Sequence, residues 1–218
     1  MKYAVLVVDG AADRPLDRLG GRTPLQVART PTLDALAHRG RCGMLETIPP
    51  GFPAGSEVAN LAILGYDPRQ YYAGRGVLEA AAMGVVLDPD DVALRCNTIC
   101  EAGGMIKNHS AGHISSEESA VLIAAIAREL GSERIVWHPG VGYRHLLVLK
   151  GGYSPDVQCM PPHDHLGEPL VSLLPVAGNP EAEETAALLR CLIAGSRAIL
   201  ADHPINRKRM AAGKDPAN

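Results

Sequence analysis

Aromatic residues are scarce in this 218-residue sequence: they make up 4% of it, with a single Trp and a single Phe. A protein that binds single-stranded nucleic acid by stacking bases on aromatic rings needs more of them. An excess of charge of one sign is also lacking, because 21 Lys and Arg stand against 24 Asp and Glu, a formal net charge of −3. The composition therefore gives no reason to expect a nucleic-acid or membrane partner.

Long apolar runs and paired cysteines are lacking as well. No stretch approaches the roughly 20 apolar residues that cross a bilayer, and the N-terminal segment has no small-residue cleavage site of a secretory signal. The five cysteines are an odd number without a Cys-x-x-Cys pair, which indicates neither a disulfide framework nor a zinc knuckle. We therefore expect a reduced, cytoplasmic protein.

The first hundred residues show an alternation of strand and helix patterns. Residues 3–8, YAVLVV, form an apolar run ended by Asp-Gly and predict a buried strand, and residues 42–48 predict the next one. Two Thr-Pro pairs mark the starts of helices between them. Helices are predicted over 23–29, 30–40, 57–64 and 77–84, and a hairpin around Gly103-Gly104. Strand, helix and strand in this order predict an α/β layer.

The pattern changes at about residue 105. An amphipathic helix capped by Ser115 or Ser116 is followed by a hairpin around Pro139-Gly140, a long loop over 151–180 and a helix that starts at Asn179-Pro180. This helix–hairpin–helix series predicts a separate α+β unit over residues 105–212. Residues 213–218 have the Gly and Pro pattern of a linker.

Asp9 and Ser56 are the first two candidate site residues. Asp9 follows the first predicted strand, where a carboxylate can hold a divalent cation, although an Asp-Gly turn explains it on local grounds. Ser56 precedes an apolar helix, so its hydroxyl can cap that helix or act as a nucleophile at its positive end. The surrounding pattern is not Gly-x-Ser-x-Gly, so a hydrolase elbow is not indicated. Taken alone, the local pattern favours the turn and the cap.

Histidines and arginines supply further candidates. Histidines lie in pairs in two segments, NHSAGHIS (108–115) and PPHDHLG (161–167), where each pair can bind a metal or lie in a surface turn. Arginine suits bidentate contact with phosphate or carboxylate, and its alternative role is an ordinary surface ion pair. The arginine candidates are Arg75, Arg95 and Arg144.

Read together, these segments resemble a known family. The order VVDGAADRP, PPGFPAGSEVANLAILGYDP, YYAGRGVLEA, SAGHIS, YRHLLVLKG, PPHDHLGEPL and HPINRKRMAAGKDPAN is similar to that of the archaeal-type cofactor-independent phosphoglycerate mutases of the alkaline phosphatase superfamily. The resemblance covers nearly the whole chain, and the block over 49–79 is the most specific. It implies an α/β fold: part of an alkaline-phosphatase-like core sheet in residues 1–104, an inserted α+β domain in 105–212, and a linker from 213.

The same resemblance implies roles for single residues. Asp9 is expected to be a metal ligand, and Ser56 both a ligand of the same metal and the nucleophile that carries a phosphoserine. Two divalent ions, manganese or magnesium, are expected, and contact with one of them would activate the serine hydroxyl. The substrate would be a small phosphorylated metabolite, 3-phosphoglycerate or 2-phosphoglycerate. The residues expected to hold it are Arg144, His113, His163 and Arg75.

Two departures from the family pattern leave alternatives open. Many relatives carry a motif like Asp-Arg-Arg-Ala-Gly-Arg where this chain has NHSAGHIS, so phosphoryl transfer involving another small hydroxy compound, such as homoserine, is the first alternative. The relatives are also much longer, and their remaining metal ligands lie in a second half. We therefore expect this chain to be an N-terminal fragment that is inactive alone. A non-catalytic anion-binding module is the other alternative.

Overall fold

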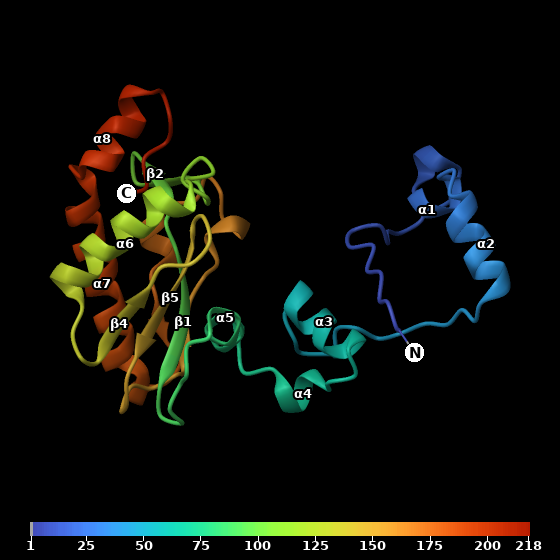
Figure 1. The fold of residues 1–218 in the computed structure, drawn as a ribbon, viewed down its shortest axis with the longest axis horizontal. Coiled ribbons are helices and arrows are strands. Elements are labelled where there is room, and N and C mark those ends of the chain that lie inside the picture. Colours follow the sequence, from blue (N-terminus) through green and yellow to red (C-terminus); the bar gives the residue numbers. More distant parts are fainter. Residues whose placement is uncertain (1) are drawn as a thin grey trace. The chain divides into compact units, whose positions relative to one another are not determined.

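The structure is a computed structural model that describes residues 2–218 (Figure 1). Its contacts divide between two units, residues 1–70 and 71–218, each of which is described by itself. Helices and sheets make up a mixed α/β fold, as expected. No helix among the described residues is both long enough and apolar enough to cross a bilayer.

The described part of the first unit consists of helices and loops. Both helices start at the predicted Thr-Pro pairs, but only the first threonine caps its helix through its side chain. Thr23 accepts a hydrogen bond from the backbone N–H of Gln26 at 3.2 Å, and the Gln26 side chain accepts one from the Thr23 N–H at 2.8 Å. This reciprocal pair satisfies two N–H groups that a helix start leaves free. The helices are η1 (Asp17–Leu19), α1 (Pro24–Val27), α2 (Pro31–Arg39), α3 (Ser56–Ile63) and, at the boundary, α4 (Pro68–Tyr71).

The strands predicted at 3–8 and 42–48 are not formed, and this prediction is wrong for the chain as it stands. Both segments are coil whose apolar side chains lie open to solvent: Leu6 is 80% exposed and Leu45 is 61% exposed. An apolar run becomes a strand only when neighbouring strands take up its backbone hydrogen bonds and other elements cover its faces. The described residues 2–70 supply no such neighbour.

The second unit is built on a three-stranded antiparallel sheet with the order β1-β5-β4. β1 (Val92–Asn97) pairs with β5 (Arg144–Leu149) from Val92 opposite Leu149 to Asn97 opposite Arg144. β5 also pairs with β4 (Ile135–His138), which confirms the hairpin predicted around Pro139-Gly140. The sequence did not predict that β1 pairs with β5, because this pairing joins segments about fifty residues apart.

Helices cover the sheet because β5 is apolar on both faces. Leu147 and Leu149 pack with residues of α7 (Glu183–Ala201), while Leu146 and Val148 pack with α5 (Arg75–Met83). α6 (Ser116–Leu130) packs against α7 and β4, and Figure 1 shows α5 beside β1. The predicted cap of α6 is confirmed, since Ser115 accepts a hydrogen bond from the Glu118 N–H at 3.2 Å. This burial on both faces makes β5 the centre of the unit.

Smaller elements complete the second unit. The hairpin predicted at Gly103-Gly104 is confirmed as β2 (Cys100–Ala102) and β3 (Met105–Asn108), and the loop after β5 pairs with it through hydrogen bonds of 2.8 and 2.9 Å between Ile106 and residues 167–168. The remaining elements are β6 (Val157–Gln158), η2 (Pro162–Asp164), η3 (Leu170–Leu173), β7 (Val176–Ala177), η4 (Pro180–Ala182) and α8 (Pro204–Ala211).

The contact boundary at residue 70 lies earlier than the expected domain boundary at 104, because α5 and β1 both pack against β5. The segment after the other expected boundary, at residue 212, also packs closely against this unit. Residues 213–218, where we expect a linker to begin, lie against this unit: the Asn218 N–H donates to the carbonyl of Ile99 at 3.0 Å, and Ala217 is fully buried.

Gly76 permits the close approach of α5 to β1, and we predict that Gly76→Ala destabilises the second unit. A methyl group at this position would overlap the backbone carbonyl of Ala93, which cannot move without disturbing the sheet. We expect the free energy of unfolding to fall by about 2 kcal/mol, measured by urea denaturation with Trp137 fluorescence. Gly43→Ala is the matched control, because its added methyl meets nothing within 4 Å. Equal stability of the two variants would contradict this packing.

His145 makes the stability of the second unit depend on pH. It is buried, its Nδ1 accepts a hydrogen bond from the Gly140 N–H at 3.1 Å, and burial lowers its pKa from 6.5 to about 4. The unfolded chain therefore binds this proton at a higher pH than the folded chain does. The stability that neutral His145 contributes is fully present above pH 6.5 and is lost as the pH falls from 6.5 to 4.

The expected loss is roughly 3 kcal/mol in the free energy of unfolding, and urea denaturation at pH 7 and pH 4.5 measures most of it. His163 and His203, whose pKa values are also lowered by burial, act in the same direction. In His145→Gln, which keeps an acceptor for Gly140, the difference between the two pH values should shrink. An unchanged difference in this variant would assign the pH effect to other groups.

Candidate functional site

Ser56 is the first residue of α3 and not its cap. The N-cap position belongs to Gly55, which has an extended backbone (φ −133°, ψ 145°) and no side chain to offer. The predicted capping role of Ser56 is therefore wrong, because the Pro/Gly-rich loop reaches the helix one residue earlier. The side chain is exposed and makes no hydrogen bond among the described residues. The hydroxyl at this helix start is thus not used by the helix itself.

Asp9 lies in an exposed turn with Gly10, whose φ is +73°. Its carboxylate and the hydroxyl of Ser56 are hard oxygen donors of the kind that manganese and magnesium bind. Two donors are too few, however, and residues 2–218 contain no group of three or more His, Cys, Asp or Glu side chains able to hold a metal. The donor chemistry of each of these two residues fits a divalent ion.

A group of polar residues gathers on the α5 face of the sheet in the second unit. Arg144 stands opposite Asn97 in the register of β5 and β1, and it shares a face of β5 with Leu146 and Val148, which contact α5. Arg95 lies two residues before Asn97 on β1, with its Nε 3.4 Å from the Asn97 Oδ1. The alternation of side chains along strands therefore places both arginines on one face.

Two histidines from separate loops meet at this group. The rings of His109 and His163 lie 6.4 Å apart, centroid to centroid, and His109 also meets the ring of Tyr143 edge-on at 5.6 Å. The guanidinium of Arg144 lies over the ring of Tyr143, 5.8 Å from its centroid. Tyr143 thus connects the histidine pair with Arg144.

The pKa of His163 is affected by its burial and by several nearby charges. Burial lowers its pKa, Asp164 opposes the shift, and the positive charges of Arg75, Arg95 and His109 lower the pKa further. Like charges close together repel one another, and the charge of Arg95 is partly neutralised within the protein by Glu79, whose Oε1 lies 3.7 Å from the Arg95 Nε. We call the set the cationic cluster; its members are Arg75, Arg95, His109, Tyr143, Arg144 and His163.

Three of the four residues expected to bind substrate thus belong to one cluster, and their role remains a prediction. The fourth, His113, has no contact with the cluster among those that the structure describes. It is exposed, it has a φ of +54°, and its N–H donates to the Ser110 Oγ at 3.2 Å. His109 was missed because no helix puts the two histidines of NHSAGHIS on one face, so their spacing did not show which one points inward. Arg95 was a candidate on chemistry alone, and only the pairing of β1 with β5 places it.

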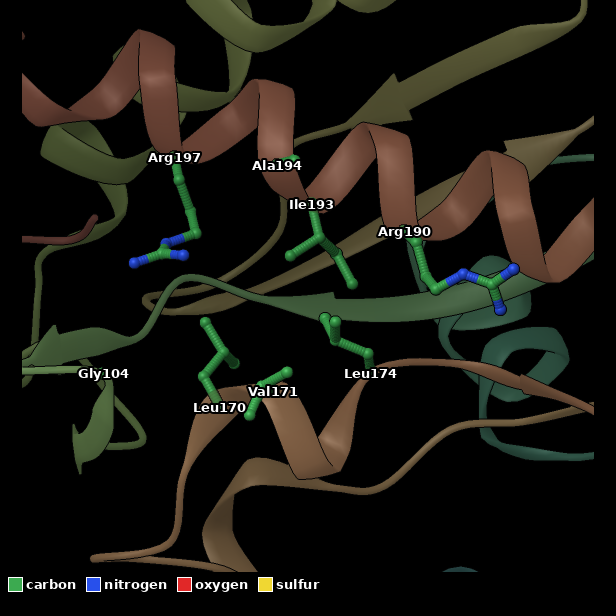
Figure 2. Close-up of a pocket in the computed structure, with 8 residues that line it drawn as sticks. All are labelled: Gly104, Leu170, Val171, Leu174, Arg190, Ile193, Ala194 and Arg197. Atoms are coloured by element: carbon green, nitrogen blue, oxygen red, sulfur yellow. The ribbon is translucent and has the colours of Figure 1, made fainter.

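A hollow of about 260 Å³ between α7 and η3 is a different kind of site (Figure 2). Its lining is apolar, with Leu170, Leu174 and Ile193 pointing into it and an arginine near each end. Arg190 already bonds the Pro175 carbonyl and Glu183, and Arg197 bonds Glu101. Both guanidinium groups are already paired with carboxylates, so the hollow does not match a site for a phosphorylated metabolite.

The family pattern described as 2,3-bisphosphoglycerate-independent phosphoglycerate mutase matches residues 37–206. The chain belongs to this family. The matched range contains Ser56 and every member of the cationic cluster, whereas Asp9 lies before it.

Relatives in this mutase family extend the similarity to the whole chain. A 2,3-bisphosphoglycerate-independent phosphoglycerate mutase of Methanosarcina mazei is 50% identical over 218 residues, which are 100% of this chain and 53% of that protein. A probable mutase of the same name from Geobacter sulfurreducens is 47% identical over 222 residues, 100% of this chain and 54% of that protein. The chain spans about half the length of the curated relatives it matches.

Two solved structures share the fold. The cofactor-independent phosphoglycerate mutase of Thermoplasma acidophilum has a TM-score of 0.60 and 33% identity, and the match covers 97% of this chain and 55% of that one. A protein of Pyrococcus horikoshii has a TM-score of 0.63 and 32% identity, with 96% and 47% of the chains covered. Both relatives are about twice as long as the part they share with this chain.

Proposed function

We propose that this chain is the N-terminal part of a metal-dependent phosphoglycerate mutase that interconverts 3-phosphoglycerate and 2-phosphoglycerate through a phosphoserine at Ser56. Among the structural observations, the cationic cluster carries the proposal, because it gathers three arginines and two histidines within the part of the chain that matches the mutase family. Membership of the family supports the type of reaction.

The cluster suits a small ligand with a phosphate and a carboxylate. Arginine offers paired N–H donors that match both groups, and Arg95 and Arg144 project from paired strands that fix their spacing. His163 adds a donor that becomes cationic when a bound anion raises its pKa, and His109 lies beside it. The lowered pKa of His163 in the free protein therefore means that anion binding and proton uptake should be coupled.

Ser56 is proposed to carry the phosphoryl group between the two hydroxyl oxygens of glycerate. Its Oγ forms a bond to phosphorus as the bond between phosphorus and the substrate oxygen breaks, and the serine proton ends on the released hydroxyl. The glycerate then presents its other hydroxyl, which takes the phosphoryl group back as the serine regains a proton. The start of α3 supports this role, because the positive end of a helix favours negative oxygen.

Asp9 and the Ser56 hydroxyl are proposed as two of the ligands of a divalent cation, manganese or magnesium, in a site that holds two such ions. A cation bound there would lower the pKa of the serine hydroxyl, so that no histidine base is required. The further ligands would come from residues outside this chain.

The exposed apolar segments of the first unit support a larger core. We propose that residues 1–104 contribute to an alkaline-phosphatase-like sheet and that segments 3–8 and 42–48 become strands when the remaining half supplies their neighbours. Residues 105–212 would be the inserted substrate-binding domain of this enzyme, which we expect to be cytoplasmic. The exposure of Leu6 and Leu45 is the observation in favour, because a soluble protein buries such runs when it can.

Turnover of the full-length protein on a panel of phosphorylated small hydroxy compounds tests this proposal. With manganese we expect conversion of 3-phosphoglycerate to 2-phosphoglycerate, and a rise in KM of about a hundredfold in Arg144→Gln, as a charged hydrogen-bonding pair is lost. Arg134→Gln is the matched control, because Arg134 bonds backbone carbonyls outside the cluster. Turnover of homoserine phosphate alone would establish the alternative suggested by NHSAGHIS, and no turnover with retained anion binding would establish a binding module.

A further inference from the structure

We propose that Arg209 is a positioning residue for the cationic cluster. It acts through the backbone of residues 111–113 and thereby keeps His109 at the cluster. The identity of the anion rests on the proposed function, but the coupling between Arg209 and His109 does not.

The loop after β3 has a conformation that needs support. Ala111, Gly112 and His113 follow one another with φ values of +47°, +62° and +54°. Residues with a side chain avoid this left-handed region, and two of these three have one. Such a run persists only where its surroundings hold it in place.

One set of bonds comes from within the loop. The Asn108 Oδ1 accepts hydrogen bonds from both the N–H and the hydroxyl of Ser110, each at 2.9 Å. The Ser110 Oγ in turn accepts the N–H of His113 at 3.2 Å. These bonds define the turn, but they do not attach it to the rest of the unit.

Arg209 provides that attachment. Its Nη2 donates to the carbonyl of Ala111 at 2.5 Å, its Nε donates to the carbonyl of Asp215 at 2.8 Å, and its remaining Nη pairs with Glu118 on α6. The side chain is only 2% exposed. One guanidinium thus joins α6, α8 and the segment after α8 to the loop, and its charge is balanced by Glu118.

The surroundings of Arg209 enclose the loop from the same side. The methyl of Ala111 is fully buried in a core cluster with Leu122 and Ala217. Asp215 lies against Gly112 and pairs with Lys107 on β3 at 2.6 Å. The segment 213–218, which the sequence presented as a linker, therefore serves to hold the loop.

His109 depends on this arrangement because it lies two residues before Ala111. It is the member of the cluster nearest to the left-handed run, and the ring contacts with Tyr143 and His163 place it. Arg95 and Arg144 lie on strands and do not depend on the loop. Loss of Arg209 should therefore remove His109 from the cluster while the arginines stay.

The experiment uses the 218-residue chain with two probes, inorganic phosphate and 3-phosphoglycerate. In Arg209→Lys we expect the nuclear Overhauser contact between the rings of His109 and Tyr143 to weaken and both dissociation constants to rise about tenfold, as for loss of one charged hydrogen bond. Lysine keeps the charge beside Glu118, so this variant should fold even where Arg209→Gln does not. Its single nitrogen cannot replace the three guanidinium nitrogens that bond Ala111, Asp215 and Glu118. Arg134→Gln, which also removes bonds from an arginine to two backbone carbonyls, should change neither readout.

Rescue separates positioning from general stability. Glycine adopts the left-handed region without strain, so Ala111→Gly added to Arg209→Lys should restore part of the ring contact and of the binding. Unchanged ring contact and binding in Arg209→Lys would overturn the proposal. If the wild-type chain binds neither probe, the proposed substrate is wrong, and the ring contact alone still decides the role of Arg209.

Discussion

Replacing Ser56 by alanine in the full-length protein is expected to reduce mutase turnover by a factor of roughly 10⁴ or more, as when a covalent nucleophile is removed. The same substitution should leave the free energy of unfolding nearly unchanged. The reason is structural: Gly55 and not Ser56 is the N-cap of α3, so alanine removes no capping bond. A coupled assay of 2-phosphoglycerate formation and urea denaturation give the two measurements.

Ser115→Ala is the matched control for this prediction. Ser115 does cap a helix, since it accepts the Glu118 N–H at 3.2 Å, and its loss should cost about 1 kcal/mol of stability. Its turnover should remain close to that of the wild type. If Ser56→Ala retained most of its turnover, or lost stability as Ser115→Ala does, Ser56 would be a structural residue and not the nucleophile.

The 218-residue chain alone is expected to show no detectable mutase turnover with manganese and 3-phosphoglycerate. Asp9 and Ser56 supply two oxygen donors, and residues 2–218 contain no cluster that completes a metal site. A divalent ion should therefore bind weakly, which calorimetric titration with manganese can measure. Mutase turnover by this chain would show that its own residues suffice, and the proposed dependence on a second half would be wrong.

Binding should survive where turnover does not. Every member of the cationic cluster lies in residues 71–218, and none belongs to the first unit. The same inactive chain should thus bind 3-phosphoglycerate without added metal. If the chain neither turned over nor bound 3-phosphoglycerate, the cationic cluster would not be the binding site for this substrate.

Local chemistry made parts of both units predictable. The Thr23 cap, the Ser115 cap and the Gly103-Gly104 turn each depend on bonds within a few residues, and all three are present. The prediction of a strand at 3–8 was wrong because a strand depends on a distant segment: it forms only when another strand pairs with its backbone N–H and C=O groups. The alternating pattern of strand and helix segments indicated where a strand could form, but it did not show whether a neighbouring strand was present to pair with it.

The cluster shows the same limit within the candidate site. The family resemblance selected Arg75, Arg144 and His163, but it did not select His109 over His113, because the left-handed turn at residues 111–113 is not visible in the sequence. Arg209 gave no signal at all. It lies in a basic, linker-like segment, and only the folded chain shows that its guanidinium is buried against Ala111.

The most direct test of the proposed reaction is to find where the phosphoryl group goes. The full-length protein would be mixed with 3-phosphoglycerate labelled in its phosphoryl group, quenched in acid, digested and mapped by peptide. We predict label on the peptide that contains Ser56, as acid-stable phosphoserine, and label in the 2-phosphoglycerate formed. Turnover with acid-labile label on a histidine, or with no label on Ser56, would contradict it.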